Sequence, residues 1–172
     1  PLDYLKFPLA YWDLIQTYAQ KNELAPFLVA GIIRQESAYN PRALSYANAR
    51  GLMQVIPPTA RRVAAQLKLR NFQIAHLYDA ETNIAIGTRY LADLLKKFDG
   101  NLYRAIAGYN AGPNATQKWW TAEGEIDHEA VVENITYRAT RNYVKRVLRN
   151  QYNYQRIYGE SLIRQVAGTP GN

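Results

Sequence analysis

Apolar residues along the chain recur mostly at helical spacing, and the strict alternation typical of β-strands is almost absent. The first helical face is formed by Leu9, Trp12, Ile15 and Ala19. We expect this helix to end near Lys21. A second helix is predicted from Pro26, a favoured first-turn residue, to Glu36. Its residues are apolar on almost every side, which predicts a central, buried helix.

Proline, glycine and capping residues divide the rest of the chain. The Asn-Pro pair at 40–41 stops the buried helix, and we expect an irregular segment from there to Pro58. Asp79 and Asn101 are predicted N-caps, the first for a long amphipathic helix that ends before Gly100. The other predicted elements are a short helical turn at 51–54, helices at 57–67, 101–109, 127–133 and 137–157, and a short helix around 119–120.

These elements predict one compact all-α domain of seven to nine helices. The length of 172 residues suits a single domain, and no change of composition marks a linker. We assign residues 1–158 to this domain and expect residues 159–172, beginning at Gly159, to form a flexible tail. No apolar run approaches the roughly 20 residues that span a bilayer, so no membrane span is expected. From the mixed, aromatic-rich residues at the start of this chain we likewise expect no signal peptide within it.

The amino-acid composition excludes several kinds of functional site. The absence of cysteine excludes disulfides, thiolate zinc sites and cysteine nucleophiles. The two histidines are isolated from other ligand types, so we expect neither a metal nor another cofactor. The 21 Lys and Arg against 14 Asp and Glu give a net charge of +7, which attracts nucleic acid, anionic lipid or an acidic cell wall, or simply keeps the protein soluble. Because these basic residues occur singly or in pairs, nucleic acid is not an expected partner.

Glu36 is the strongest candidate for chemistry. It ends the helix that we expect to be buried, and desolvation would raise its pKa and make it a proton donor near neutral pH. The alternative is an ordinary solvated glutamate paired with Arg34 or Arg42. No acidic residue follows Glu36 until Asp79, whereas most glycosidases use two carboxylates. A second acid shortly after the first is therefore not available, although an acid from Asp79 onward could fold back to the site.

Three short motifs accompany Glu36. They are Glu-Ser-Ala-Tyr-Asn-Pro at 36–41, Gly-Leu-Met-Gln at 51–54 and Ala-Gly-Tyr-Asn-Ala-Gly-Pro at 107–113, with Ser45 between the first two. Each motif is ordinary alone. Together, in this order and spacing, they resemble the catalytic domain of soluble lytic murein transglycosylases, the goose-lysozyme-like SLT domain, over roughly residues 11–154. The resemblance implies a goose-type lysozyme-like helical bundle with a substrate groove.

The resemblance also implies an enzyme with one catalytic carboxyl. Glu36 would protonate the β-1,4 glycosidic oxygen between N-acetylmuramic acid and N-acetylglucosamine, while the muramyl acetamido oxygen assists at C1. The carboxylate would then take the proton of the C6 hydroxyl, whose oxygen closes a 1,6-anhydro ring without consuming water. Both nucleophiles belong to the substrate, so positioning replaces a second carboxylate.

Further residues acquire expected roles through the same resemblance. Ser45 would contact the acetamido group or orient the carboxyl, although it can equally cap a turn. Gln54 would bond both carboxyl and sugar, and the Tyr109 hydroxyl would donate to Glu36 or steady the intermediate. Met53 would pack beneath the site, and Asn110 would shape its turn. The expected substrate-binding set is Ser45, Met53, Gln54, Tyr109, Asn110 and Tyr143.

One position departs from the family pattern. An acid commonly precedes the Thr-Arg pair at 140–141, and this chain has Ala139 there. Glu133 is a possible substitute or a plain surface residue, and we do not assign it catalysis. Two alternatives stay open: a goose-type lysozyme that hydrolyses the same bond with water, and an inactive glycan-binding module of the same fold. The resemblance further implies peptidoglycan strands as partner, a monomer, and export to the periplasm or envelope of a bacterium.

Overall fold

The computed structural model describes residues 2–119, 132–133 and 135–167, and the regular secondary structure of this part of the chain is helical. Its only β-pairing consists of isolated bridges in the segment between α3 and α4, where Arg50 pairs with Leu44 and with Val55. The elements are α1 (Leu2–Lys6), α2 (Trp12–Lys21), α3 (Pro26–Ser37), α4 (Pro57–Gln66), the 3-10 helix η1 (Ile74–Tyr78), α5 (Ala80–Lys97), α6 (Leu102–Ala111), α7 (Pro113–Lys118) and α9 (Arg138–Ala167). The predicted all-α class, with seven to nine helices, is confirmed.

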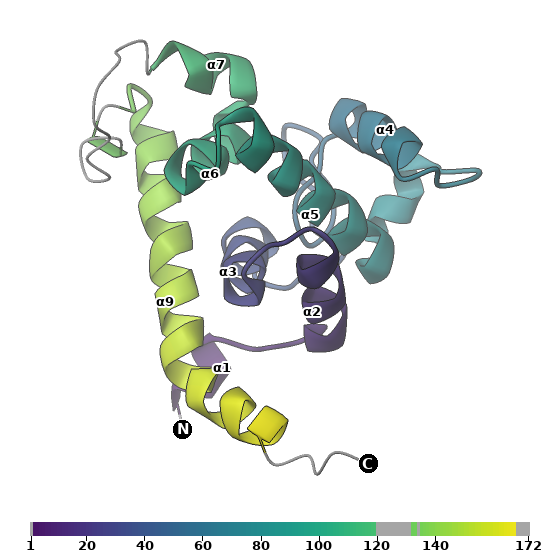
Figure 1. Cartoon of the computed structure of the whole chain (residues 1–172). Helices are drawn as coiled ribbons and strands as arrows, with labels where there is room; N and C mark the ends of the chain where they lie inside the picture. The colour runs from purple at the N-terminus through teal and green to yellow at the C-terminus, as the bar shows by residue number, and fades with distance from the viewer. Residues whose placement is uncertain (1, 120–131, 134, 168–172) are drawn as a thin grey trace.

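Helix α3 lies at the centre of the fold. Six consecutive residues, 28–33, are buried, which confirms the prediction made from their apolar pattern. Long helix α9 runs along one side of α3 and α6 (Figure 1). A Cβ on Gly31 would lie 3.0 Å from the Gln151 nitrogen and 3.1 Å from the Val147 oxygen. The missing side chain therefore lets the α3 and α9 backbones approach closely at the middle of α3.

The predicted caps are present. The Asp79 side chain accepts a hydrogen bond from the Thr82 amide at the start of α5, and the Asn101 side chain accepts one from the Arg104 amide at the start of α6. Each cap satisfies an amide that the first turn of a helix leaves without a partner. Pro26 occupies the first turn of α3, as expected. These local signals place the helix starts because they act within one turn.

Several boundaries differ from the prediction. Helix α9 continues through Gly159 to Ala167, ten residues beyond the predicted end at 157. The segment 51–54 forms a turn between bridges rather than a turn of helix. Helices α1 and η1 were not predicted, because five residues are too few to show a period. Most of the predicted helix at 127–133 lies outside the described residues, and so does Trp120 of the predicted short helix around 119–120. The flexible tail stays a prediction.

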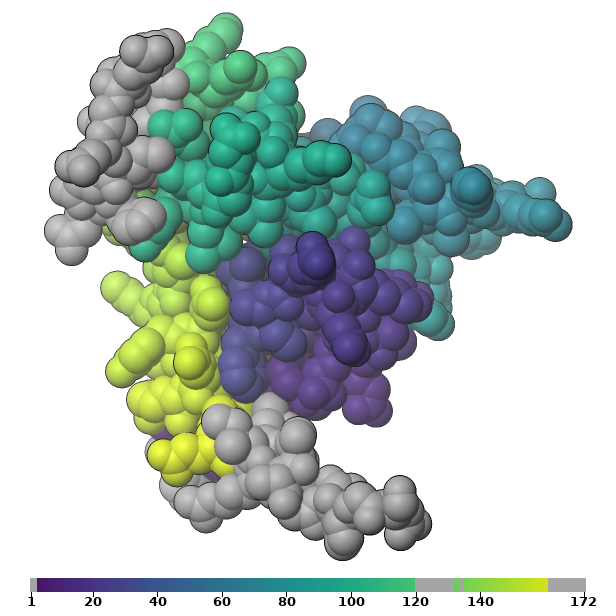
Figure 2. All heavy atoms as spheres, viewed as in Figure 1, coloured from purple at the N-terminus to yellow at the C-terminus, as the bar shows by residue number. Residues whose placement is uncertain are grey.

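Around this centre, α2 packs on α3 and α5, while α4 and η1 pack on α5. The segment between α4 and η1 projects from the body at the right of Figures 1 and 2. Three segments meet near the first turns of α9: the end of α3, the loop 38–56 and the end of α6. None of the helices in the described residues is long and apolar enough to cross a membrane.

Candidate active site

Glu36 occupies the last turn of α3 and opens onto a cleft of about 400 Å³. The helix ends one residue later, and Ala38 follows in a left-handed conformation with φ of 49°. This turn directs the chain into the loop that forms the opposite wall. The cleft is lined by Glu36, Ser45, Ala47, Ala49, Gln54, Val55, Ile56, Thr59, Tyr90, Tyr109, Asn110, Ala111 and Gly112. Glu36 is the single acidic residue in this described lining.

Burial dominates the ionisation of Glu36. Desolvation raises its pKa from 4.5 to about 7, and a hydrogen bond from Tyr143 opposes that rise only in part. The Tyr143 hydroxyl donates to Oε1 of Glu36 at 2.6 Å. Within the described residues no ion pair joins Glu36 to Arg34 or Arg42, and the Arg34 guanidinium lies 4.2 Å from the Phe7 ring centre. The carboxyl is therefore ready to exchange a proton near neutral pH.

Tyr109 and Tyr143 donate their hydroxyl protons to different acceptors. Tyr109 was expected to donate to Glu36 or to steady the intermediate. Its hydroxyl donates to the Met53 carbonyl at 2.8 Å and not to Glu36, and its role toward the intermediate stays a prediction. A phenol has one proton, so the direct donor to Glu36 is Tyr143 on α9. Burial raises the pKa of both phenols well above 10.0, with the Glu36 charge adding to it. Both tyrosines thus stay protonated and act as donors.

Asn83 organises the Gly-Leu-Met-Gln turn and was missed by the sequence reasoning. This fully buried side chain on α5 donates through Nδ2 to the carbonyl oxygens of Arg50 at 2.9 Å and Leu77 at 2.8 Å. Its Oδ1 accepts from the Met53 amide at 2.7 Å. The available signal was a polar residue on the apolar face of an amphipathic helix. A buried side-chain amide is tolerated in a protein interior when its polar atoms are hydrogen-bonded, as they are here.

Met53 and Gln54 are the last two residues of this turn. The Met53 side chain is fully buried against Gly87, as its expected packing role requires. Gln54 lines the cleft, but its Nε2 donates to the carbonyl oxygens of Ala43 at 3.1 Å and Gly51 at 2.9 Å. The two amide protons are therefore engaged by the backbone. What Gln54 can offer to a carboxyl proton or a sugar hydroxyl is its amide oxygen.

Ser45 and Asn110 lie on opposite walls of the cleft. The Ser45 Oγ accepts a hydrogen bond from the Ala49 amide at 3.1 Å, so Ser45 caps this turn. Ser45 also lines the cleft. Asn110 uses its Oδ1 to accept from the Thr140 hydroxyl at 2.8 Å. This bond ties the end of α6 to the first turn of α9. Asn110 thereby holds one wall in place.

The acid that Ala139 replaces is not supplied by Glu133. Ala139 is exposed on the first turn of α9. Glu133 is 56% exposed and pairs with Lys145 at 2.6 Å and Arg141 at 3.5 Å. The hydrogen bond from Lys145 lowers the pKa of Glu133, which makes it a poor proton donor. No group of three His, Cys, Asp or Glu side chains that could hold a metal occurs in the described part of the chain.

Known proteins share this architecture. The soluble lytic murein transglycosylase of Escherichia coli (strain K12) is 40% identical over 157 residues, which are 90% of this chain and 24% of that protein. The crystal structure of the 70-kDa soluble lytic transglycosylase from Escherichia coli superimposes with a TM-score of 0.86 and 39% identity, over 91% of this chain and 26% of that one.

The lytic transglycosylase Slt from Pseudomonas aeruginosa, solved as an inactive mutant with glutamine in place of one glutamate, has a TM-score of 0.84. It is 30% identical over 90% of this chain and 25% of that one. The chain thus spans about a quarter of the length of these relatives. Residues 13–132 match the family described as the Transglycosylase SLT domain. The chain belongs to the transglycosylase SLT domain family.

Proposed function

We propose that this domain is a lytic transglycosylase that cleaves the glycan strands of peptidoglycan, with Glu36 as its catalytic acid and base. One observation carries the proposal. A partly buried carboxyl with a pKa of about 7 is the only acid in the described lining of the cleft. A mechanism with two carboxylates has no second group there. The inactive Glu-to-Gln mutant of the Pseudomonas aeruginosa relative supports an essential carboxyl in this family.

The first step breaks the glycosidic bond. Protonated Glu36 donates to the β-1,4 oxygen between N-acetylmuramic acid and N-acetylglucosamine, and that oxygen leaves as the 4-hydroxyl of the N-acetylglucosamine. The muramyl acetamido oxygen attacks C1 as the bond breaks. The raised pKa of Glu36 serves this step because a useful fraction of the carboxyl is protonated at neutral pH.

The second step closes the product ring and restores the enzyme. Glu36, now a carboxylate, takes the proton of the C6 hydroxyl, and the C6 oxygen displaces the acetamido oxygen from C1. The product is a 1,6-anhydromuramyl end, and Glu36 carries a proton again. The overall reaction consumes no water. One carboxyl with a pKa near the working pH can perform both transfers.

The surrounding residues position this carboxyl and the sugar. Tyr143 fixes the Glu36 carboxyl through its hydrogen bond and steadies the ionised form. Gln54 offers its amide oxygen and Ser45 its hydroxyl to substrate groups in the cleft. Tyr109 and Asn110 act through the protein, the first by holding the Met53 carbonyl and the second by joining α6 to α9.

Replacing Tyr143 by Phe should move the pH profile. The Tyr143 hydrogen bond lowers the pKa of Glu36, so its loss raises that pKa. Glu36 then stays protonated to higher pH, and the alkaline limb of kcat/KM moves upward. Hydrogen bonds to charged groups contribute about 1.5–3 kcal/mol, which corresponds to a shift of roughly one to two pH units. Initial rates of glycan release between pH 5 and pH 9 measure the shift.

Tyr109→Phe is the matched control for this experiment. It also removes one buried phenol hydroxyl, but that hydroxyl donates to Met53 and not to Glu36. We expect lower activity with the alkaline limb in place. An alkaline limb that moves in Tyr109→Phe and stays in Tyr143→Phe would show that Tyr109, not Tyr143, is the working donor.

The enzyme assignment is tested with purified bacterial sacculi. We expect the wild-type domain to release soluble muropeptides at a rate proportional to its concentration. Release at the background level would reject the enzyme and leave a glycan-binding module. Because the substrate is an extracytoplasmic polymer, we place the protein in the periplasm or envelope of a bacterium. We also propose that the protein is a monomer.

A further inference from the structure

Exposed apolar side chains are concentrated on the loop 38–56, which forms one wall of the catalytic cleft. In the described part of the chain, large apolar side chains are exposed at eight positions, and three of these belong to this loop: Leu44, Tyr46 and Ile56. Single apolar residues scattered over a surface need no ligand, whereas a concentration of them beside a cleft marks a contact surface. Tyr46 is the most exposed of the three, at 114%.

The turn that carries Tyr46 is fixed by hydrogen bonds at its base. The Asn48 amide donates to the Ser45 carbonyl at 3.0 Å, and the Ser45 amide donates to the Ala49 carbonyl at 3.0 Å. Asn48 closes the turn in a left-handed conformation, with φ of 62°. Its Oδ1 accepts a hydrogen bond from Nη2 of Arg50 at 2.9 Å. Tyr46 therefore stands at the tip of an ordered turn.

The Tyr46 ring is open to solvent on both faces. At 114% exposure the side chain touches almost no other part of the protein. Ser45 and Ala47, the residues on either side of it, both line the cleft that contains Glu36. The ring consequently stands at the rim of this cleft, where a bound strand can cover it.

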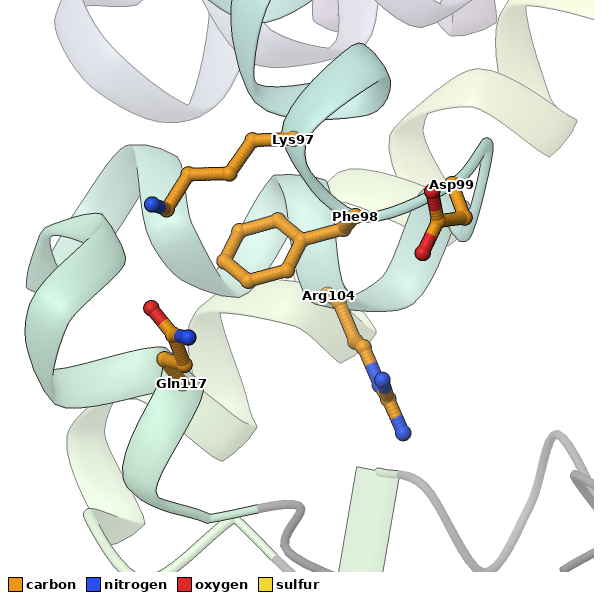
Figure 3. Close-up of a pocket in the computed structure, with 5 residues that line it drawn as sticks. All are labelled: Lys97, Phe98, Asp99, Arg104 and Gln117. Carbon is orange, nitrogen blue, oxygen red and sulfur yellow. The ribbon is translucent and has the colours of Figure 1, made fainter. Parts of the chain in front are cut away.

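Rings that line the hollows of the molecule are not open in this way. Half-buried Tyr90 packs against Tyr109 in the cleft, with their ring centres 5.2 Å apart. Phe98 lines a cavity of about 210 Å³ at the end of α5 and is only 7% exposed. The polar side chains around this ring are those of Lys97, Asp99, Arg104 and Gln117 (Figure 3). Neither Tyr90 nor Phe98 offers a whole ring face to a ligand.

The size of the cleft requires a long strand to continue over its rim. The volume of about 400 Å³ lies in the lower part of the range of roughly 300–1,000 Å³ for sites that enclose one drug-sized ligand. A disaccharide is a ligand of this size. A glycan strand is a polymer, so its next sugars lie outside the cleft and meet the rim.

We propose that Tyr46 stacks on a sugar of the glycan strand that lies outside the cleft, and that it thereby favours long strands over short fragments. This inference rests on the proposed function, because it takes the strand in the cleft to be peptidoglycan. The axial C–H groups of a β-1,4-linked pyranose form an apolar face, and covering the tyrosine ring with this face removes apolar area from water. Because the backbone of the turn is already fixed, binding orders only two side-chain torsions of Tyr46.

The test compares a short and a long glycan in the Glu36→Gln chain, which binds without turnover. The ligands are peptide-free glycans of two and of eight sugars prepared from peptidoglycan, and their Kd values come from NMR titrations. Tyr46→Ala and Tyr46→Phe are made in this chain. Tyr152→Ala is the matched control, since Tyr152 is 65% exposed on α9 and does not line the cleft. Thermal unfolding checks that each variant is folded.

We expect Tyr46→Ala to raise the Kd of the eight-sugar glycan about five- to tenfold and to leave that of the disaccharide within about twofold. Tyr46→Phe, which keeps the ring, should bind both glycans as the parent chain does, and so should Tyr152→Ala. An unchanged Kd for the long glycan in Tyr46→Ala would overturn the proposal.

Two other results would also overturn it. An equal loss on both glycans would place the action of Tyr46 inside the cleft, and a Tyr46→Phe chain as weak as Tyr46→Ala would assign the contact to the hydroxyl. Failure of the proposed function is seen separately, as background release in the sacculus assay. A parent chain that binds neither glycan would reject both.

Discussion

Glu36→Gln should abolish glycan cleavage while leaving the fold intact. Glutamine keeps the shape of the side chain and can still accept the hydrogen bond from Tyr143, but it has no proton to donate at the first step and no basic oxygen at the second. General acid–base groups contribute about 10²–10⁴-fold each, so we expect a loss of at least about 10³-fold in kcat. Release of soluble muropeptides from sacculi measures this loss.

A stability measurement checks that the variant is folded. The native pKa of Glu36 is about 7 against 4.5 for an ordinary glutamate, so the native protein binds more protons than the unfolded chain between these values. Wild-type stability therefore falls as pH rises through this window. The Glu36→Gln chain lacks this contribution because an amide does not ionise. Between pH 4 and pH 8, we expect the free energy of unfolding of the variant to rise by up to about 3 kcal/mol relative to that of wild type.

Glu133→Gln supplies the matched control for the activity loss. It makes the same carboxyl-to-amide change at an exposed position that pairs with Lys145 and Arg141. We expect activity within about twofold of wild type, since exposed ion pairs contribute little. A Glu36→Gln chain that keeps a tenth or more of wild-type activity, or a Glu133→Gln chain that loses it, would contradict the assignment of Glu36.

Gly51→Ala should disrupt the loop 38–56, which lines the cleft beside Glu36. A Cβ there would lie 2.1 Å from the Leu77 oxygen and 2.3 Å from Nδ2 of Asn83. Neither neighbour can retreat, because these two atoms are hydrogen-bonded to each other and Asn83 also holds the Arg50 and Met53 backbone. We expect a destabilisation of about 4 kcal/mol or more, which lowers Tm by roughly 10 °C in a domain of this size. Thermal unfolding followed by circular dichroism measures it.

Gly100→Ala separates the steric clash from backbone strain. Gly100 has φ of +79°, close to the +77° of Gly51, but a Cβ there meets nothing within 4 Å. Only the left-handed conformation is penalised, at about 1–2 kcal/mol. If the two variants lose equal stability, the close approach of Gly51 to Leu77 and Asn83 does not stabilise the loop as we describe.

Features encoded within one or two helical turns were predictable from the sequence. The caps Asp79 and Asn101, the Pro26 start and the burial of α3 all follow from local chemistry and periodicity, and the structure confirms them. Helix α9 exceeded its prediction because Gly159 was taken as a stop, although a lone glycine weakens a helix by only about 1 kcal/mol. A lone glycine is thus a weaker stop signal than a cap or a proline.

The pairing of side chains across the site was not predictable. Tyr109 was expected to donate to Glu36 or to steady the intermediate, yet the direct donor to Glu36 is Tyr143, which is 107 residues from Glu36 in the sequence. Asn83 appears in none of the three motifs and still holds the central one together. Such contacts depend on how α5, α6 and α9 pack on α3, which no local pattern in one sequence specifies. The hydrogen-bond partners of the candidate residues were therefore not predictable from the sequence, and the roles of those residues stay predictions.

Mass spectrometry of the products from digested sacculi tests the central claim most directly. If Glu36 acts alone as acid and then base, the new muramyl ends carry a 1,6-anhydro ring. They are then one water molecule lighter than reducing ends, and digestion in ¹⁸O-labelled water leaves them unlabelled. Reducing muramic acid ends that carry one ¹⁸O at C1 would show hydrolysis, as in a goose-type lysozyme, and would contradict this account.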